Sequence, residues 1–332
     1  MPNVELIRNN IYRIGIPLKG NPLKELNSYF IKGEKFDLLI DTGFRTQSCE
    51  EALRNGLEEL NSDNSRRHLA ITHLHSDHAA MGDLFVGKNN PIYMSSVDFN
   101  IMSDFVEHIK ERSSQKALET NYSMGFTDEM LDYLDKNSPM KAFYIHDIKN
   151  LNFVLMKDQD IIDMGDRKLK WVSTPGHTPG NSMLWDEDNK IMFTGDNILF
   201  DITPNTTNWE NVKDSLGDYL NSLDYADSFP VELALPGHRQ TGDYHKRIAE
   251  IKKHHEVRLN EVINCVFSKP GLSAIEIAGN MTWDIKAKNW DEFPIIQKWF
   301  AVGECQAHLD YLLCRNIIRK ERDGILWKYY KY

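Results

Sequence analysis

Four potential metal ligands lie within six residues of this chain, in a His-x-His-x-Asp-His pattern that runs from His73 to His78. The apolar run at residues 68–72 precedes them and is typical of a short buried strand. Side chains alternate along an extended chain, so His73 and His75 are expected to point to the same side. Asp77 and His78 would then come from the turn into a helix. The pattern therefore predicts two pairs of ligands that face two different metal ions.

Three later stretches each add one ligand at the junction of a strand and a loop. They read Pro-Gly-His, Thr-Gly-Asp and Leu-Pro-Gly-His. Gly176 and Gly237 directly precede histidines and are expected to permit tight turns that aim the rings inward. Neutral imidazole and carboxylate suit Zn²⁺, and to a degree Fe and Mn. The seven candidate ligands, with Asp196 as the candidate bridge between two ions, are His73, His75, Asp77, His78, His177, Asp196 and His238.

This ligand set resembles that of the metallo-β-lactamase superfamily, and the resemblance extends over about residues 10–240. It implies an α/β fold of the αββα type, in which a dinuclear metal site lies between two β-sheets. A first ion would be held by His73, His75 and His177. A second ion would be held by Asp77, His78 and His238, with Asp196 as the bridge. The resemblance also implies that Asp41, in an Asp-Thr-Gly stretch, steadies the ligand loop.

Strand and helix patterns alternate through most of residues 1–245, which we expect to form the catalytic domain. Two β-hairpins are predicted where Lys-Gly-Glu-Lys at 32–35 and Asp-Glu-Asp-Asn at 186–189 separate apolar runs. Further strands are expected at 4–18, 68–72, 91–95 and 231–235, and helices at 46–61 and 208–227.

Residues 98–143 interrupt this alternation with apolar residues at helical spacing among many charges. The stretch is interpreted as a helical insertion that covers the metal centre as a lid. The alternative is a helical layer that only packs against the rest of the domain.

Residues 246–332 are expected to form a linker helix and a small C-terminal domain. The helix would end near Phe267, because Lys-Pro-Gly follows at 269–271. The Asp-Gly pair at 323–324, between two apolar runs, predicts a hairpin at the end of the chain. With short helices expected at 272–278, 294–302 and 304–316, this tail resembles a winged helix.

Charge is uneven along the chain, whose formal net charge is −10. Residues 1–245 carry a net −14 and residues 246–332 a net +4. The acidic residues 1–245 disfavour broad binding to nucleic acid, whereas the basic tail, residues 246–332, is compatible with an anionic partner. Four scattered cysteines, no secretory pattern at Met1–Glu5 and no apolar run near eighteen residues favour a cytoplasmic protein without a membrane span.

The resemblance implies a zinc-dependent hydrolase with two Zn²⁺ per chain, although Fe or Mn is also compatible with the ligands. A hydroxide that bridges the two ions would attack a carbonyl, and Asp77 would steer it as well as bind the second ion. A small thioester or ester is the favoured substrate class. His75 argues against the diiron oxygen-reducing branch, which usually has Glu there. Ala80 stands where the family most often has Gly, a small loop change.

Three alternatives stay open at this point. The chain resembles phosphodiesterases and ribonucleases of the same fold, and the basic residues of the tail favour a role for it in holding RNA. Persulfide dioxygenases, which are oxidoreductases, use a very similar ligand set with one iron. A third interpretation makes the tail a dimerisation or regulatory module, and in the first case the protein would be a homodimer.

Overall fold

The computed structural model describes residues 3–107, 115–137 and 148–332. Its contacts divide the chain into two compact units. The first unit comprises residues 1–107, 139–204 and 224–248, and the second comprises 108–138, 205–223 and 249–332. Every candidate metal ligand belongs to the first unit.

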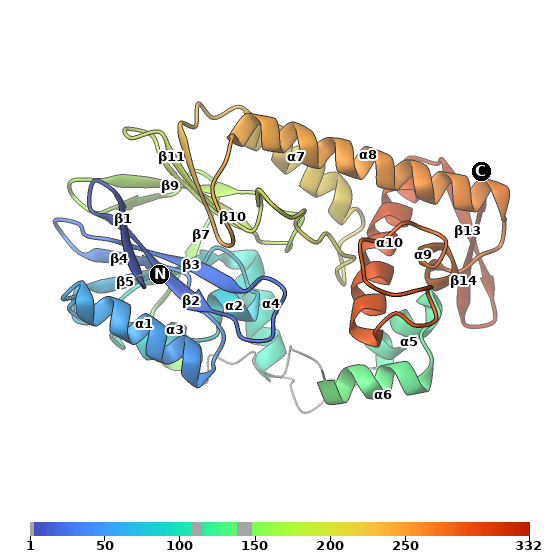
Figure 1. Ribbon diagram of the computed structural model, residues 1–332, viewed down its shortest axis with the longest axis horizontal. Helices are drawn as coiled ribbons and strands as arrows, with labels where there is room; N and C mark the ends of the chain where they lie inside the picture. The colour runs from blue at the N-terminus through green and yellow to red at the C-terminus, as the bar shows by residue number, and fades with distance from the viewer. Residues whose placement is uncertain (1–2, 108–114, 138–147) are drawn as a thin grey trace. The chain divides into compact units, whose positions relative to one another are not determined.

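A seven-stranded sheet forms one layer of the first unit (Figure 1). In spatial order its strands are β1 (Val4–Arg8), β2 (Ile11–Pro17), β3 (Glu25–Ile31), β4 (Asp37–Ile40), β5 (Arg67–Ala70), β6 (Ile92–Ser95) and β7 (Phe153–Met156). Strands β1 to β4 pair antiparallel, and β4 to β7 pair parallel. The hairpin predicted at 32–35 is confirmed, with Tyr29 paired to Ile40.

The second sheet has five strands and carries three of the ligand loops. Its order is β12 (Leu233–Pro236), β11 (Ile191–Gly195), β10 (Ser182–Asp186), β9 (Lys168–Ser173) and β8 (Ile161–Asp163). Strand β10 runs antiparallel to β9 and β11, and β12 runs parallel to β11. The carboxyl ends of β9, β11 and β12 therefore meet at one edge of the sheet. The hairpin predicted at 186–189 is confirmed.

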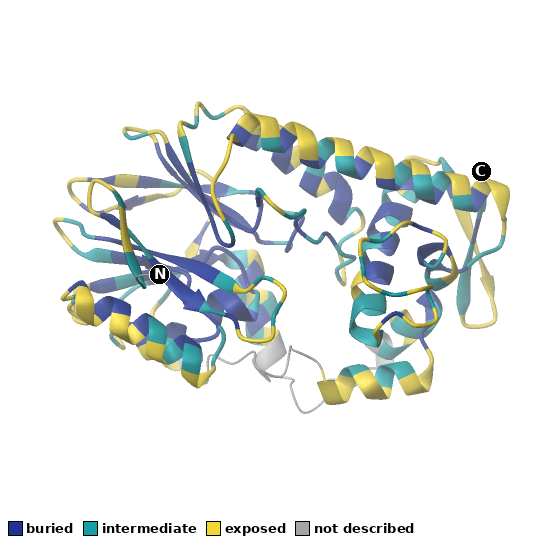
Figure 2. Ribbon diagram, viewed as in Figure 1, coloured by how far each residue is buried: buried dark blue, intermediate teal, exposed yellow. Residues whose placement is uncertain are grey.

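The two sheets enclose one apolar core. Tyr29 and Leu38 of the first sheet share this core with Trp171 and Phe193 of the second. The rings of Tyr29 and Phe193 meet edge to face, with centroids 5.4 Å apart. Burial of each large side chain of this kind contributes about 1.5–3 kcal/mol. Figure 2 shows the inner strands as almost continuously buried, and every residue of β10 and β11 is buried.

Helices that pack on the seven-stranded sheet complete the first unit, which has the expected mixed α/β class. Helix α1 (Gln47–Glu59) packs on β2, and α4 (Ser96–Glu107) packs on β6 and β7. Helix α1 begins where the Thr46 hydroxyl accepts from the Cys49 N–H. The short helix α2 (Ser76–Ala79) carries the last two residues of the first ligand cluster, α3 (Gly82–Phe85) follows it, and the 3₁₀ turn η2 (Ile148–Asn150) precedes β7.

The second unit is mainly helical, with a terminal two-stranded sheet. Its elements are α5 (Gln115–Met124), α6 (Asp128–Asn137), the first part of α7 (Ser215–Asp227), most of α8 (Tyr244–Ser268), α9 (Ala274–Ala278), α10 (Ile295–Cys314), β13 (Ile318–Asp323) and β14 (Leu326–Lys331). The terminal hairpin is confirmed, and Gly324 adopts the positive φ of 61° that its turn requires.

The separate helices predicted at 294–302 and 304–316 are wrong, because α10 is one continuous helix over Ile295–Cys314. Gly303 lies inside it. A β-carbon there would stand 2.3 Å from the Thr207 hydroxyl, so this glycine permits close packing and does not end the helix. The winged-helix description of the tail stays a prediction.

Helices α5 and α6, from the stretch expected to form a lid, pack within the second unit. Met124 and Phe126 share a core there with Val262, Ile277 and Leu309. Residues 108–114 and 138–147 of the same stretch lie outside the described residues. The lid role and the boundary at residue 245 stay predictions. Within the described ranges, no helix combines the length and apolar character needed to cross a membrane.

Candidate metal centre

The fold brings all seven candidate ligands together. His73 and His75 lie in the loop after β5, and Asp77 and His78 lie in α2. The remaining three follow β9, β11 and β12 at the shared edge of the second sheet: His177, Asp196 and His238. Six of the seven are buried, and His75 is half-buried. Buried polar groups at this density need partners that satisfy them.

The ligand atoms form three overlapping three-residue groups. His73, His75 and His177 make the three-histidine group, and Asp77, His78 and His238 make the aspartate group. The third group, His73, His78 and Asp196, shares one histidine with each of the other two. Within each group the candidate ligand atoms all lie within 4.8 Å of one another. The assignment of the first two groups to two separate ions stays a prediction.

Asp196 lies between the two groups. Its Oδ1 is 3.4 Å from His78 Nε2, and its Oδ2 is 3.4 Å from His238 Nε2 and 3.9 Å from His177 Nε2. Its two oxygens thus reach imidazoles of both groups, which is the position that a bridging carboxylate needs.

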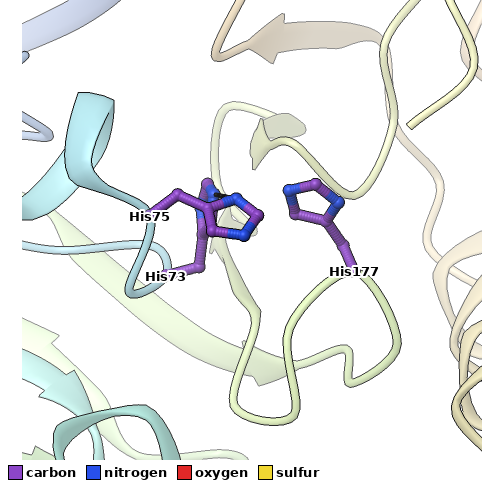
Figure 3. Close-up of side chains that lie close together, drawn as sticks. All are labelled: His73, His75 and His177. Carbon is purple, nitrogen blue, oxygen red and sulfur yellow. Dashed lines mark hydrogen bonds between the residues drawn. The ribbon is translucent and has the colours of Figure 1, made fainter. Parts of the chain in front are cut away.

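Figure 3 shows the rings of His73, His75 and His177 facing one another from two separate loops. Their centroids are 4.6–4.9 Å apart. His73 Nε2 lies 3.1 Å from His75 Nδ1. Nitrogen atoms that converge in this way suit a shared cation, because their lone pairs point into one volume.

Asp41 sets the orientation of two rings. His78 Nδ1 donates to Asp41 Oδ2 at 2.7 Å, so His78 Nε2 points inward. The Thr72 hydroxyl also donates to Asp41 Oδ2, at 2.8 Å. Because that proton is already used, the Thr72 oxygen accepts from His73 Nδ1, 3.0 Å away. His73 Nε2 is thereby also directed into the centre. Asp41 thus contacts the ligand loop through Thr72, and its role in steadying that loop stays a prediction.

A different element holds His238. Its Nδ1 donates to the Glu25 carbonyl of β3 at 2.8 Å. The buried Asn27 amide donates to the carbonyls of Pro236 and Arg239, each at 2.9 Å, and the Asn27 N–H donates to the Gly237 carbonyl at 2.7 Å. Asn27 is a supporting residue that the sequence does not reveal, since it lies more than 200 positions from its partners.

The glycines before the ligand histidines have different roles. Gly176 has a φ of 140°, which supports the predicted tight turn before His177. Gly237 is instead required because a side chain at this position would collide with the ligands. A β-carbon at Gly237 would lie 2.5 Å from Asp196 Oδ1 and 2.9 Å from His78 Cε1.

The electrostatics of the centre favour a bound cation. Burial, reinforced by the neighbouring histidines, lowers the pKa of His73 well below its ordinary value. Burial is also the main cause that lowers the pKa of His75, to about 3. Both rings are therefore neutral at pH 7, which is the form that binds metal.

In the aspartate group, the neighbouring charges outweigh burial in their effect on the pKa values. Burial alone would raise the pKa of Asp77, but the charge of His78 and the contact with His238 lower it to about 2. Burial lowers the pKa of His78, but Asp196, Asp41 and Asp77 raise it well above the ordinary value. These carboxylates attract positive charge, and a metal ion would replace the protons on the imidazoles.

Asp98 is a further buried acid near the ligand loops that the sequence does not single out. It lies in the first turn of α4, where acids are common because they favour a helix N-terminus. Position alone therefore does not distinguish it from an ordinary helix-start residue.

The family model of the metallo-beta-lactamase superfamily matches residues 25–238. With the two stacked sheets and the ligand groups at their edge, this match shows that the chain belongs to that superfamily. Family membership and the His/Asp groups together support a metal-binding protein. Together with the similarity to a protein named as a thioesterase, which is described next, they support a hydrolase.

Two curated relatives illustrate the range of similar proteins. The chain is 28% identical over 225 residues to "Acyl-coenzyme A thioesterase MBLAC2" of Homo sapiens, which covers 65% of this chain and 73% of that protein. It is 25% identical over 268 residues to "Lactamase-like protein adaB" of Aspergillus niger, covering 79% and 66% respectively.

Two solved structures share the fold. A metallo-beta-lactamase family protein from Thermus thermophilus has a TM-score of 0.81 at 22% identity, covering 98% of this chain and 100% of that one. A beta-lactamase domain protein from Burkholderia ambifaria has a TM-score of 0.78 at 20% identity, covering 99% and 95%.

Proposed function

We propose that this protein is a zinc-dependent hydrolase of small thioesters or esters, with two metal ions in the centre described above. The observation that carries the proposal is the convergence of two ligand groups on either side of Asp196. The similarity to a protein named as an acyl-coenzyme A thioesterase supports a thioester as the substrate class.

The residues present fit two metal ions. Each group offers three inward ligand atoms of the imidazole and carboxylate type, and zinc accepts both. When bound, two ions of this kind polarise a carbonyl and make water a stronger nucleophile. Fe or Mn would use the same donors, so the choice of zinc belongs to the proposal.

The chain's own residues orient and charge the centre. Asp41 and the Glu25 carbonyl fix the tautomers of His78 and His238, so that each presents Nε2 inward. Asp77 Oδ2 lies 3.2 Å from His238 Nε2 and is ionised at pH 7. We assign Asp77 the further role of steering the attacking hydroxide, in addition to its place in the aspartate group.

A hydrolysis panel combined with elemental analysis tests the proposal. The purified protein is expected to contain two zinc ions per chain and to cleave thioesters faster than lactones and phosphodiesters. His75→Ala and Asp196→Ala are expected to reduce this activity to background. His245→Ala is the matched control, because His245 is an exposed residue of α8 whose ring contacts Asp227 and belongs to neither ligand group.

Two outcomes would contradict the proposal in distinct ways. Fast cleavage of phosphodiesters or RNA with no thioesterase activity would indicate a nuclease of the same fold. One iron per chain, with oxygen consumption on persulfides and no hydrolysis, would indicate a dioxygenase. A small-molecule substrate is part of the proposal, whereas the homodimer and the cytoplasmic location stay predictions.

A further inference from the structure

One buried carboxylate connects the two loops that carry the three-histidine group. Asp98 is completely buried in the first turn of α4. Its Oδ2 accepts from the Leu74 N–H at 2.9 Å and from the Thr178 hydroxyl at 2.6 Å. Its Oδ1 accepts from the Gly180 N–H at 2.6 Å. One side chain thus satisfies donors that lie 24, 80 and 82 positions away in sequence.

The partners of Asp98 are placed directly beside ligands. Leu74 lies between His73 and His75, and Thr178 follows His177. The carboxylate therefore fixes the distance between the backbone that carries two histidines and the loop that carries the third. All three hydrogen bonds go to the loops of the three-histidine group.

The loop after His177 is shaped to receive this carboxylate. A β-carbon at Gly180 would lie 2.4 Å from Ser95 Oγ and 2.7 Å from Asp98 Oδ1. Only glycine lets the loop approach the start of α4 this closely. Ser95 Oγ in turn accepts from the Val97 N–H at 3.2 Å, which holds the first turn of α4 in place.

We propose that Asp98 is a positioning residue for the metal ion held by His73, His75 and His177. The inference rests on the metal-binding part of the proposed function. Hydrogen bonds to a charged acceptor are stronger than those between neutral groups, so the connection is stiff. Loss of the carboxylate would leave buried donors unsatisfied and let the two loops separate. The aspartate group would keep its own supports from Asp41 and Glu25.

Three variants test the proposal. Asp98→Asn keeps the size of the side chain but replaces one acceptor oxygen with an NH₂ donor, so one of its partners must lose its bond. Thr178→Val removes the hydroxyl that reaches Asp98 and leaves the carboxylate intact. Thr178→Ser is the matched control, because it retains that hydroxyl. If Asp98→Asn fails to fold, the threonine pair still decides the question.

The readout is metal affinity at each of the two groups, measured by Co²⁺ titration of the metal-free full chain in competition with a chelator. His177→Ala and His238→Ala serve as references that assign each step, and each visible Co²⁺ spectrum, to one group. Asp98→Asn is expected to weaken Co²⁺ binding at the three-histidine group by about 10- to 100-fold and to change the Co²⁺ spectrum of that group. Co²⁺ binding at the aspartate group is expected to keep its wild-type affinity. Thr178→Val is expected to weaken Co²⁺ binding at the three-histidine group less than Asp98→Asn does. Thr178→Ser is expected to leave this binding at wild-type affinity.

Unchanged affinity and spectrum at both steps in Asp98→Asn and Thr178→Val, with only a lower melting temperature of the metal-free protein, would overturn the inference. Equal weakening of both steps would also overturn it. A wild-type chain that binds no Co²⁺ or Zn²⁺ would overturn the proposed function itself, together with this inference. Because the titration needs no substrate, an error in the proposed substrate class leaves its outcome unaffected.

Discussion

Replacement of Gly237 by alanine places one methyl group against the centre of the site. The new β-carbon would lie 2.5 Å from Asp196 Oδ1, whereas ordinary van der Waals contacts begin at 3.4 Å, so about 0.9 Å of movement is required. The backbone cannot easily retreat. The Gly237 N–H donates to the Gly195 carbonyl at 2.8 Å, and its carbonyl accepts from Asn27 at 2.7 Å. Asp196 must therefore move.

The expected result is a large loss of activity with a modest loss of stability. Displacement of a reacting group by about 1 Å costs on the order of 100-fold in rate, so we expect kcat/KM of Gly237→Ala to fall by about that factor. Overpacking of an interior site costs about 1–3 kcal/mol, so the variant should still fold. The assays are steady-state kinetics on the best thioester, metal content by elemental analysis and thermal unfolding.

Gly20→Ala is the control for Gly237→Ala. Gly20 has a φ of 78° and no atom within 4 Å of a built β-carbon, so alanine there adds backbone strain of about 1–2 kcal/mol and no contact with the site. Wild-type kinetics and metal content in Gly237→Ala would refute the argument. Equal activity losses in the two variants would show that general destabilisation, and not displacement of Asp196, is the cause.

Three further changes have defined outcomes. Asp41→Asn is expected to lower metal affinity in chelator competition by about 10- to 100-fold, because it disturbs the support of His78; unchanged affinity would contradict this. Asn27→Ala is expected to cost about 1–3 kcal/mol in urea unfolding, since the carbonyls around His238 lose donors, and a smaller change would argue against that role. Burial raises the pKa of Glu276, but hydrogen bonds from Ser273 and the charge of Lys328 lower it to about 2. A lowered pKa means that ionised Glu276 stabilises the folded protein. This contribution is complete above the unfolded pKa of 4.5 and disappears as pH falls through about 2. The Tm difference between wild type and Glu276→Gln should therefore narrow from pH 6 to pH 2, and a constant difference would exclude the effect.

Much of the candidate site could be predicted from the sequence because ligand identity is a local property. His73, His75, Asp77 and His78 follow one another on a single strand-to-helix junction. The period of an extended chain pairs His73 with His75, and the turn into a helix sets Asp77 and His78 apart from them. Both sheet hairpins were likewise predictable, since short polar turns separate the paired apolar runs.

The residues that orient the ligands were not predictable in the same way. Asn27 reaches Pro236 across 209 positions, and Asp98 reaches Thr178 across 80. Neither has a local pattern that distinguishes it from an ordinary polar residue of a strand or helix start. Gly303 shows the same difficulty in the second unit. A glycine inside an apolar run suggests a helix end, but its effect here depends on the approach of Thr207, which only the fold reveals.

Two acids, Asp41 and Asp98, hold the histidines at positions 73, 78 and 177, whereas the Glu25 carbonyl and Asn27 hold the loop of His238. Asp41 holds the His78 ring directly and the His73 ring through Thr72. Asp98 holds the backbone beside His73 and the loop beside His177. His73 is therefore fixed from both sides, by its ring and by its backbone, which suits a residue whose candidate ligand atom lies near both groups. A chain that kept all seven ligands but lacked both acids would retain the composition of the centre and lose the supports of the His73, His78 and His177 side chains and loops, because nothing local to the ligand motif replaces these contacts.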